Sequence, residues 1–122
     1  NDHSCVNAAT QFAAMEALNG PQDAVRNMVA QFDTRRDVIV RELNALPGVR
    51  CPDPAGAFYA FANIEDTGMS ATQAQNMFLN DAGVATVAGT SFGAWGEGYV
   101  RFSYANSTEN IIDAIHRIRG LL

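Results

Sequence analysis

The spacing of apolar residues along the chain predicts two helices near its start. An alanine-rich stretch from Val6 to Leu18 predicts the first helix, and Asn19-Gly20 is a typical end signal. From about Pro21 to Leu46, apolar residues recur at steps of three and four, while arginines and carboxylates fall on the opposite face. At 1.5 Å per residue this second helix would be roughly 39 Å long. That is longer than a small domain needs, so we expect it to connect this domain to another part of a protein.

Capping residues predict two more helices. Ser70 and Gln73 have the spacing of a capping box in front of a helix over about 71–82. Asn106 and Glu109 predict the start of a last helix. The apolar residues of this last helix recur at helical spacing: Ile111, Ile112, Ile115, Ile118 and Leu122.

Short strands are predicted between these helices. Val49–Cys51 favours one strand, and Ala57–Ala62 is apolar on both faces, which is typical of a central strand. Val84–Val87 and Tyr99–Tyr104 predict two more, separated by a glycine-rich loop over 89–98. The fold class is therefore α+β: a small mixed or antiparallel sheet packed against helices, with a long N-terminal connector helix.

Composition and charge narrow the possible functions. The 122 residues are 48% hydrophobic, which predicts one packed domain. A net charge of −5 and a pI of about 4.7 disfavour nucleic acid and anionic membranes as partners. No apolar run is long enough to span a bilayer. Cys5 and Cys51 are far apart and lack metal-ligand spacing, so we expect free thiols and a cytoplasmic location. His3 has no nearby ligand group except Asp2, so no metal site is predicted.

The basic residues are all arginine. The sequence has eight of them and no lysine, so the chain cannot form a Schiff base with a carbonyl compound. It begins with Asn1 and not with methionine. We therefore expect the chain to be a piece of a longer protein.

Arg101 is the candidate binding residue that most needs an explanation. In a strand of period two, Tyr99, Arg101 and Ser103 share one face, so an arginine stands among aromatic residues in mid-strand. A guanidinium group can hold a carboxylate through two parallel hydrogen bonds. The alternatives are an arginine on the solvated face of the sheet and an arginine paired with an acid of its own fold.

A serine nucleophile is a weaker alternative. Gly89-Thr90-Ser91-Phe92-Gly93 matches G-x-S-x-G, and Asp113 and His116 follow in the chain order of a serine hydrolase. The residues that follow Ser91 favour a loop, whereas this nucleophile requires a helix directly after the serine. Asp113 can also pair more simply with Arg117 on the same helix.

Three segments in order resemble one known family. They are Gly56-Ala57-Phe58-Tyr59, the run Gly83-Val84-Ala85-Thr86-Val87-Ala88-Gly89-Thr90-Ser91-Phe92-Gly93, and Gly98-Tyr99-Val100-Arg101-Phe102-Ser103-Tyr104-Ala105. The set resembles the C-terminal part of the class I/II, fold-type I aminotransferases, which use pyridoxal phosphate, and in particular the aspartate and aromatic branch. The opening Ser4–Gln11 is similar to the segment that follows that family's cofactor-lysine region.

The resemblance implies a role for particular residues. Arg101 falls on the arginine that binds the substrate α-carboxylate. Phe58 and Tyr59 fall on a strand that borders the substrate entrance, and Phe92 falls on a loop near it. His3 and Ser4 fall near a segment that approaches the neighbouring subunit's active site, and no contact is assigned to them. No catalytic or cofactor-binding residue is expected in this chain.

The resemblance also implies the place of this chain in a longer enzyme. Residues 1–20 would be the end of the large cofactor domain, and residues 21–122 the small C-terminal domain. The full-length enzyme would transfer an amino group between an amino acid and a 2-oxo acid, with pyridoxal 5'-phosphate as cofactor, as a homodimer. The chain alone, separated from the large domain, would bind no cofactor and be inactive. A stand-alone module that binds a carboxylate or an acidic partner remains the alternative. Family members usually have proline where Ala88 stands, which leaves the rigidity of the following loop open.

Overall fold

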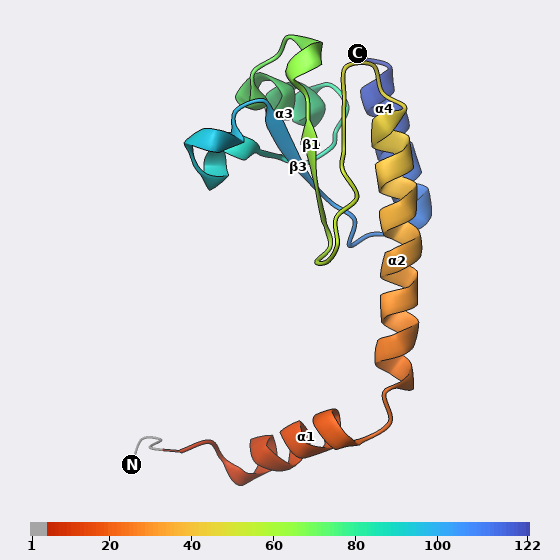
Figure 1. The fold of residues 1–122 in the computed structure, drawn as a ribbon, viewed down its shortest axis with the longest axis vertical. Helices are drawn as coiled ribbons and strands as arrows, with labels where there is room; N and C mark the ends of the chain where they lie inside the picture. Colours follow the sequence, from red (N-terminus) through yellow and green to blue (C-terminus); the bar gives the residue numbers. More distant parts are fainter. Residues whose placement is uncertain (1–4) are drawn as a thin grey trace. The chain divides into compact units, whose positions relative to one another are not determined.

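The computed structural model describes residues 5–122 and confirms an α+β fold (Figure 1). The chain divides into two compact units. The first ends at Ala30, and the second runs from Gln31 to Leu122. The boundary lies inside the second helix. The described residues form four α-helices: α1 (Ala8–Asn19), α2 (Asp23–Asn44), α3 (Ala71–Asn80) and α4 (Thr108–Arg119).

The first unit contains α1 and the start of α2, and its apolar side chains are exposed. Asn7 caps α1, because its side chain accepts a hydrogen bond from the backbone N–H of Thr10 at 2.9 Å. None of the residues of α1 is buried. The large apolar side chains exposed on this unit are Val6, Phe12, Met15, Leu18, Val25, Met28 and Val29. A helix that exposes this much apolar surface is typical of one that packs against a partner.

The long second helix is confirmed, with somewhat shorter bounds than expected. It has 22 residues and is therefore about 33 Å long. It begins two residues after the expected start at Pro21 and ends two residues before Leu46. Its second half buries Val38, Ile39 and Leu43, whereas its first half buries no side chain. The apolar stripe along the helix therefore meets a core of the second unit only beyond residue 31.

A three-stranded antiparallel sheet lies at the centre of the second unit. Its strands are β1 (Tyr59–Asn63), β2 (Val87–Ala88) and β3 (Tyr99–Ser103), and their order in the sheet is β1-β3-β2. The expectation that residues 57–62 form a central strand is therefore wrong. β1 is at an edge, and β3 is the strand with a neighbour on both sides. The sequence misled because β1 carries apolar side chains on both of its faces, with Ala60 and Ala62 on one and Tyr59 and Phe61 on the other.

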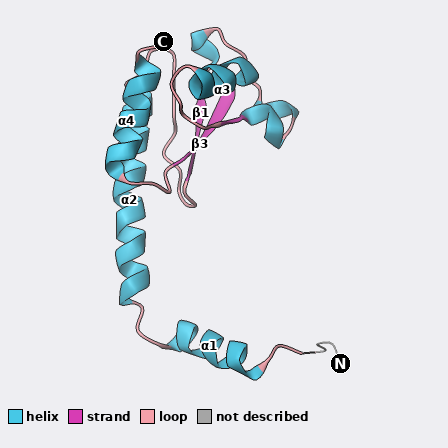
Figure 2. Cartoon of the chain, turned by 180° about the vertical axis from the view of Figure 1, so that it is seen from behind, coloured by secondary structure: helices cyan, strands magenta, loops and turns pink. Residues whose placement is uncertain are grey.

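Only one face of this sheet is covered by helices of the second unit. Inward-facing residues of the strands (Ala60, Ala62, Val100 and Phe102) join one buried cluster with side chains from α2, α3 and α4. The Phe78 and Phe102 rings, from α3 and β3, have centroids 6.1 Å apart. α4 lies beside the second half of α2, as Figure 1 and the rear view in Figure 2 both show.

Three local expectations need correction. The segment Val49–Cys51 is not a strand, because it makes only an isolated bridge between Arg50 and Asn63. The strand expected over 84–87 is limited to Val87–Ala88. The cap of α4 is Ser107 and not Asn106, since the Ser107 hydroxyl accepts from the backbone N–H of Asn110 at 3.2 Å. Asn106 instead accepts from the Ser107 backbone N–H at 2.8 Å. In the described part of the chain, no helix is long and apolar enough to cross a membrane.

The burial of α4 gives a test of the fold. Ile115 is 1% exposed and belongs to the core, whereas Ile112 of the same helix is only half-buried. We expect Ile115→Ala to lower the free energy of unfolding by about 2–5 kcal/mol, because it removes buried methyl groups and leaves a cavity. Ile112→Ala, a matched control, should cost clearly less. Urea unfolding of both variants measures the difference, and equal losses would contradict this packing.

Candidate functional site

Arg101 lies in the middle of β3, on the face of the sheet that no helix of the second unit covers. Strand alternation places Tyr99, Arg101 and Ser103 on this face, while Val100 and Phe102 are buried on the other. The central position of β3 puts Phe61 of β1 and Val87 of β2 opposite Arg101. The predicted grouping of residues 99–103 by face is confirmed, and the arginine is flanked by a strand on each side.

Two aromatic rings lie against the Arg101 guanidinium. Its Cζ atom is 4.2 Å from the centroid of the Tyr59 ring and 4.6 Å from that of Phe92. Both distances are within the range of cation–π attraction, which contributes about 0.5–2 kcal/mol for each ring depending on solvent exposure. The structure thus brings together three of the four residues that the resemblance implies for substrate binding.

Arg101 has no acidic partner among residues 5–122. No carboxylate of these residues comes within 4.0 Å of its nitrogens, and no acceptor in the same range takes a hydrogen bond from its guanidinium. The side chain is nevertheless half-buried. Of the two alternatives raised for Arg101, pairing with an acid of the described fold is therefore excluded. Its N–H donors are available for an anion from outside.

Two further aromatic residues, Phe61 and Tyr99, extend this surface. Sequence reasoning placed Tyr99 on the face of Arg101 but did not name it as a site residue, and it missed Phe61. Phe61 and Tyr99 stack with ring centroids 5.2 Å apart and an interplanar angle of 8°. The Phe61 ring also meets Phe92 edge-on at 6.1 Å. The period of two along residues 59–63 could have found Phe61, because it puts Tyr59 and Phe61 on one face. We call the group formed by Arg101, Tyr59, Phe61, Phe92 and Tyr99 the arginine–aromatic cluster.

Phe58 lies beside this cluster and does not contact the guanidinium. Its ring centroid is 4.5 Å from that of Tyr59 and 6.1 Å from that of Phe32 on α2. Phe58 is 40% exposed. It therefore forms a border between the cluster and the second half of α2.

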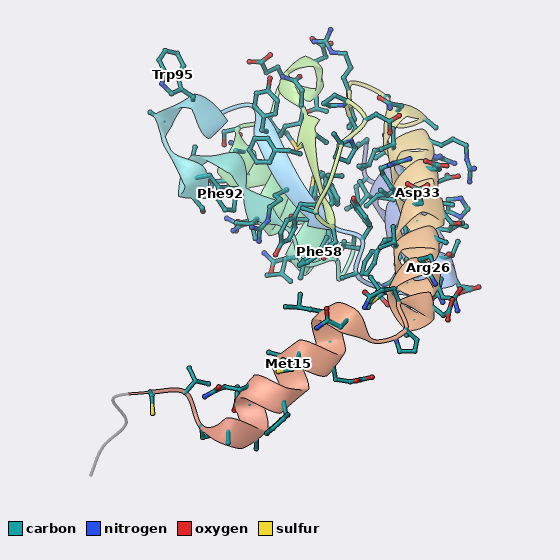
Figure 3. The ribbon with its side chains drawn as sticks, turned by 60° about the horizontal axis from the view of Figure 1, so that its bottom comes forward. Met15, Arg26, Asp33, Phe58, Phe92 and Trp95 are labelled. Atoms are coloured by element: carbon teal, nitrogen blue, oxygen red, sulfur yellow. The ribbon has the colours of Figure 1, made fainter. Side chains whose placement is uncertain are left out.

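The loop that carries Phe92 connects β2 to β3 over residues 89–98. It contains two short 3₁₀ turns, Gly89–Phe92 and Ala94–Gly96, and Trp95 at its tip is 97% exposed (Figure 3). The backbone N–H of Ala88 donates to Oε1 of Gln75 at 2.7 Å. A proline at 88 could not make this bond, because it has no N–H. Ala88 thus allows a hydrogen bond between the start of the loop and α3 that a proline at this position could not make.

Comparison with known proteins now identifies the family. The model of the family described as aminotransferase class I and II matches residues 1–118. The chain belongs to this family. It is 43% identical to an aspartate aminotransferase of Pyrococcus horikoshii over 92% of the chain, and 42% identical to a putative aminotransferase of Bacillus subtilis over 97% of it. It spans only 29% and 30% of the lengths of these two relatives.

A solved aminotransferase structure supports the same conclusion. The aromatic aminotransferase of Pyrococcus horikoshii OT3 is 39% identical and superposes with a TM-score of 0.86 over 92% of this chain and 30% of its own. The two proteins are therefore similar in both sequence and fold. The aminotransferase resemblance inferred from the sequence is therefore confirmed.

Other candidate sites find no support within residues 5–122. Ser91 is exposed and lies in a 3₁₀ turn, not before the helix that a hydrolase nucleophile needs. Nε2 of His116 faces Glu42 at 4.0 Å, and Asp113 pairs with Arg117, as expected. These residues contain no cluster of three metal-ligating side chains. His3 and Ser4 lie outside the described residues.

A cavity of about 380 Å³ lies apart from the arginine–aromatic cluster. α4 and the segment 83–85 contribute to its lining, together with Phe102 on the covered face of the sheet. Its arginine, Arg117, already donates to the carbonyl oxygen of Ala82 at 3.2 Å and pairs with Asp113. Because that charge is already satisfied, the cavity offers no free cation for a substrate carboxylate.

The two cysteines are free, and their environments differ. Cys5 is exposed and Cys51 is buried. Burial, and to a lesser degree the nearby Asp53 carboxylate, raises the pKa of the Cys51 thiol to about 11. At neutral pH this thiol is therefore protonated, and it is not a nucleophile for this aminotransferase chain.

This difference predicts two reaction rates with a thiol reagent. At pH 8 we expect Cys5 to react promptly and Cys51 to react only when the protein unfolds. Absorbance of released thionitrobenzoate measures both phases, and Cys5→Ser should remove the fast phase alone. Two equal, fast rates in the folded protein would contradict the burial of Cys51.

The raised pKa of Cys51 also makes the stability of the fold depend on pH. The contribution of Cys51 to the free energy of unfolding is full below the ordinary thiol pKa and is lost as pH rises towards 11.

Proposed function

We propose that this chain supplies the arginine that binds the substrate α-carboxylate in a longer aminotransferase. The observation that carries the proposal is the state of Arg101. It is half-buried on a central strand, lies against two aromatic rings and has no acid partner among residues 5–122. A charge held in this way gains most from an anionic ligand, because its N–H donors are otherwise left to water.

Arg101 would fix both the position and the direction of the substrate. A guanidinium group donates two parallel hydrogen bonds to a carboxylate, so it defines the orientation of the bound amino acid as well as its location. Tyr59 and Phe92 limit the freedom of the guanidinium and reduce the entropy lost on binding. Phe58 would form part of the border of the substrate entrance. The role of these residues is to bind and orient, which makes the following chemistry intramolecular.

The cofactor belongs to another part of the enzyme in this proposal. The family implies pyridoxal phosphate, whose ring withdraws electrons from the bound amino acid. This chain does not fit that group, because it has no lysine amine to bond to the cofactor aldehyde. We therefore propose that the isolated chain is inactive, although the full-length protein is an enzyme.

The domain assignment follows from the same proposal. Residues 1–20 would end the large cofactor domain, and residues 21–122 would form the small, C-terminal domain. The exposed apolar side chains of α1, such as Phe12 at 70% and Leu18 at 80%, support a partner surface on this segment. That partner would be the large domain of the same chain or the second subunit of a homodimer.

The proposal names the substrate class and not one substrate. The relatives are named for aspartate and for aromatic amino acids, whose side chains differ greatly. Every α-amino acid and 2-oxo acid has the carboxylate that Arg101 would bind. We therefore propose transfer of an amino group between an amino acid and a 2-oxo acid.

Replacement of Arg101 tests this function. In the full-length protein, Arg101→Ala should lower kcat/KM by the equivalent of about 2–5 kcal/mol, because it removes one partner of a desolvated charge pair. Arg101→Lys should recover only part of the loss, since lysine keeps the charge but lacks the planar fork. Steady-state kinetics with L-aspartate and L-phenylalanine as amino donors provides the measurement.

Arg50→Ala is the matched control. Arg50 is an exposed arginine that pairs with Asp66 at 3.2 Å, and its replacement should leave kcat/KM unchanged. If Arg101→Ala kept the wild-type kcat/KM, the carboxylate-binding role would be refuted. An equal loss of kcat/KM in Arg50→Ala would show that the effect comes from the loss of a positive charge in general and not from the loss of a binding group at position 101.

A further inference from the structure

The loop that presents Phe92 is tied to helix α3 at both of its ends. At the start, Oε1 of Gln75 accepts from the backbone N–H of Ala88 at 2.7 Å. At the end, Oε1 of Glu97 accepts from the backbone N–H of Ala71 at 2.8 Å and from that of Gly98 at 3.2 Å. Each bond to α3 joins residues that are far apart in sequence. They are tertiary ties and not part of local turn geometry.

The Glu97 tie uses an N–H that α3 itself leaves free. The first N–H groups of a helix have no acceptor within the helix. Ser70 and Gln73 form a capping box at this helix start, and Glu97 provides the acceptor for Ala71. A carboxylate at a helix N-terminus is also favoured by the helix dipole. Glu97 is therefore bound by charge and by hydrogen bonding at once.

Backbone contact closes the loop just inside these two ties. Gly89 and Gly96 are both buried and lie against one another. A Cβ atom on either glycine would overlap the carbonyl oxygen of the other. The backbones of the two arms of the loop therefore approach closely at Gly89 and Gly96, just inside the two ties.

Phe92 is the residue through which this loop contacts Arg101. Its ring is 4.6 Å from the guanidinium Cζ atom and 6.1 Å from the Phe61 ring. Phe92 is 53% exposed, so few other contacts in the described chain hold it in place. Where the loop lies therefore decides whether the ring stays against the guanidinium.

We propose that Glu97 and Gln75 are positioning residues for the carboxylate-binding arginine. They hold the 89–98 loop on α3 and so keep Phe92 against Arg101, which presets the guanidinium for a bidentate carboxylate. This inference rests on the proposed function of Arg101. Neither residue contacts substrate in this scheme, and their effect reaches the substrate through the loop and Phe92.

The test compares three variants in the full-length protein with L-aspartate and L-phenylalanine as amino donors. Glu97→Ala should raise KM about tenfold with little change in kcat, as expected for the loss of a charge-assisted tie that orders a binding group. Glu97→Gln keeps an Oε1 acceptor but loses the charge, so it should restore KM only in part. Asp81→Ala, which removes a carboxylate from the other end of α3, should match the wild type.

Trp95 provides a readout that does not depend on catalysis. It is the only tryptophan in the sequence and lies at the loop tip. In the 122-residue chain, Glu97→Ala should lower the fluorescence anisotropy of Trp95, and Glu97→Gln should lower it less. If Glu97→Ala proves too unstable to study, Gln75→Ala removes the other tie and should change KM and anisotropy in the same directions.

The outcomes separate this inference from the function on which it rests. Loss of activity in Arg101→Ala with wild-type KM in both Glu97→Ala and Gln75→Ala would overturn the positioning role alone. A rise in KM for Asp81→Ala equal to that for Glu97→Ala would assign the effect to a general loss of negative charge and would also overturn the positioning role. Wild-type kcat/KM in Arg101→Ala would overturn the proposed function itself.

Discussion

The alternation of side chains along β3 is the constraint on which the rest of the second unit depends. Because successive residues point to opposite faces, Val100 and Phe102 enter the core while Arg101 faces away from it. Burial of these two residues against α3 and α4 fixes the register of the strand, and a slip of one residue would drive the arginine into the core. The hydrophobic core therefore positions the charge without touching it.

The same constraint explains why the helices gather on one side. The second half of α2, α3 and α4 all pack on the face that holds Val100 and Phe102. The other face keeps an arginine, three aromatic rings of the strands and the Phe92 loop. A layer of helices over this face would bury the guanidinium without a partner, at a cost of several kcal/mol. The bare face is thus a consequence of placing Arg101 on the central strand.

Most element types could be predicted from the sequence, but their places in the sheet could not. Helical periodicity found α2 and α4 because it depends on neighbours three and four residues apart. Strand order depends on pairing between strands that are distant in sequence, such as Phe61 of β1 with Arg101 of β3, and no local pattern records it. β1 was expected to be central because Tyr59 and Phe61 make its second face apolar, whereas these rings belong to the arginine–aromatic cluster. The sequence likewise did not indicate a role for Glu97, since its hydrogen bond with Ala71 forms only in the tertiary structure.

The chemistry of the cluster also explains why arginine and not lysine suits position 101. A guanidinium is flat and weakly hydrated, so the Tyr59 and Phe92 rings can lie against it while its edge still donates to a carboxylate. An ammonium group is compact and strongly hydrated, and would lose more solvation in the same surroundings. Aromatic packing and carboxylate binding are therefore compatible in one side chain. The rings hold the charge in place, and the charge keeps an exposed apolar face selective for anions.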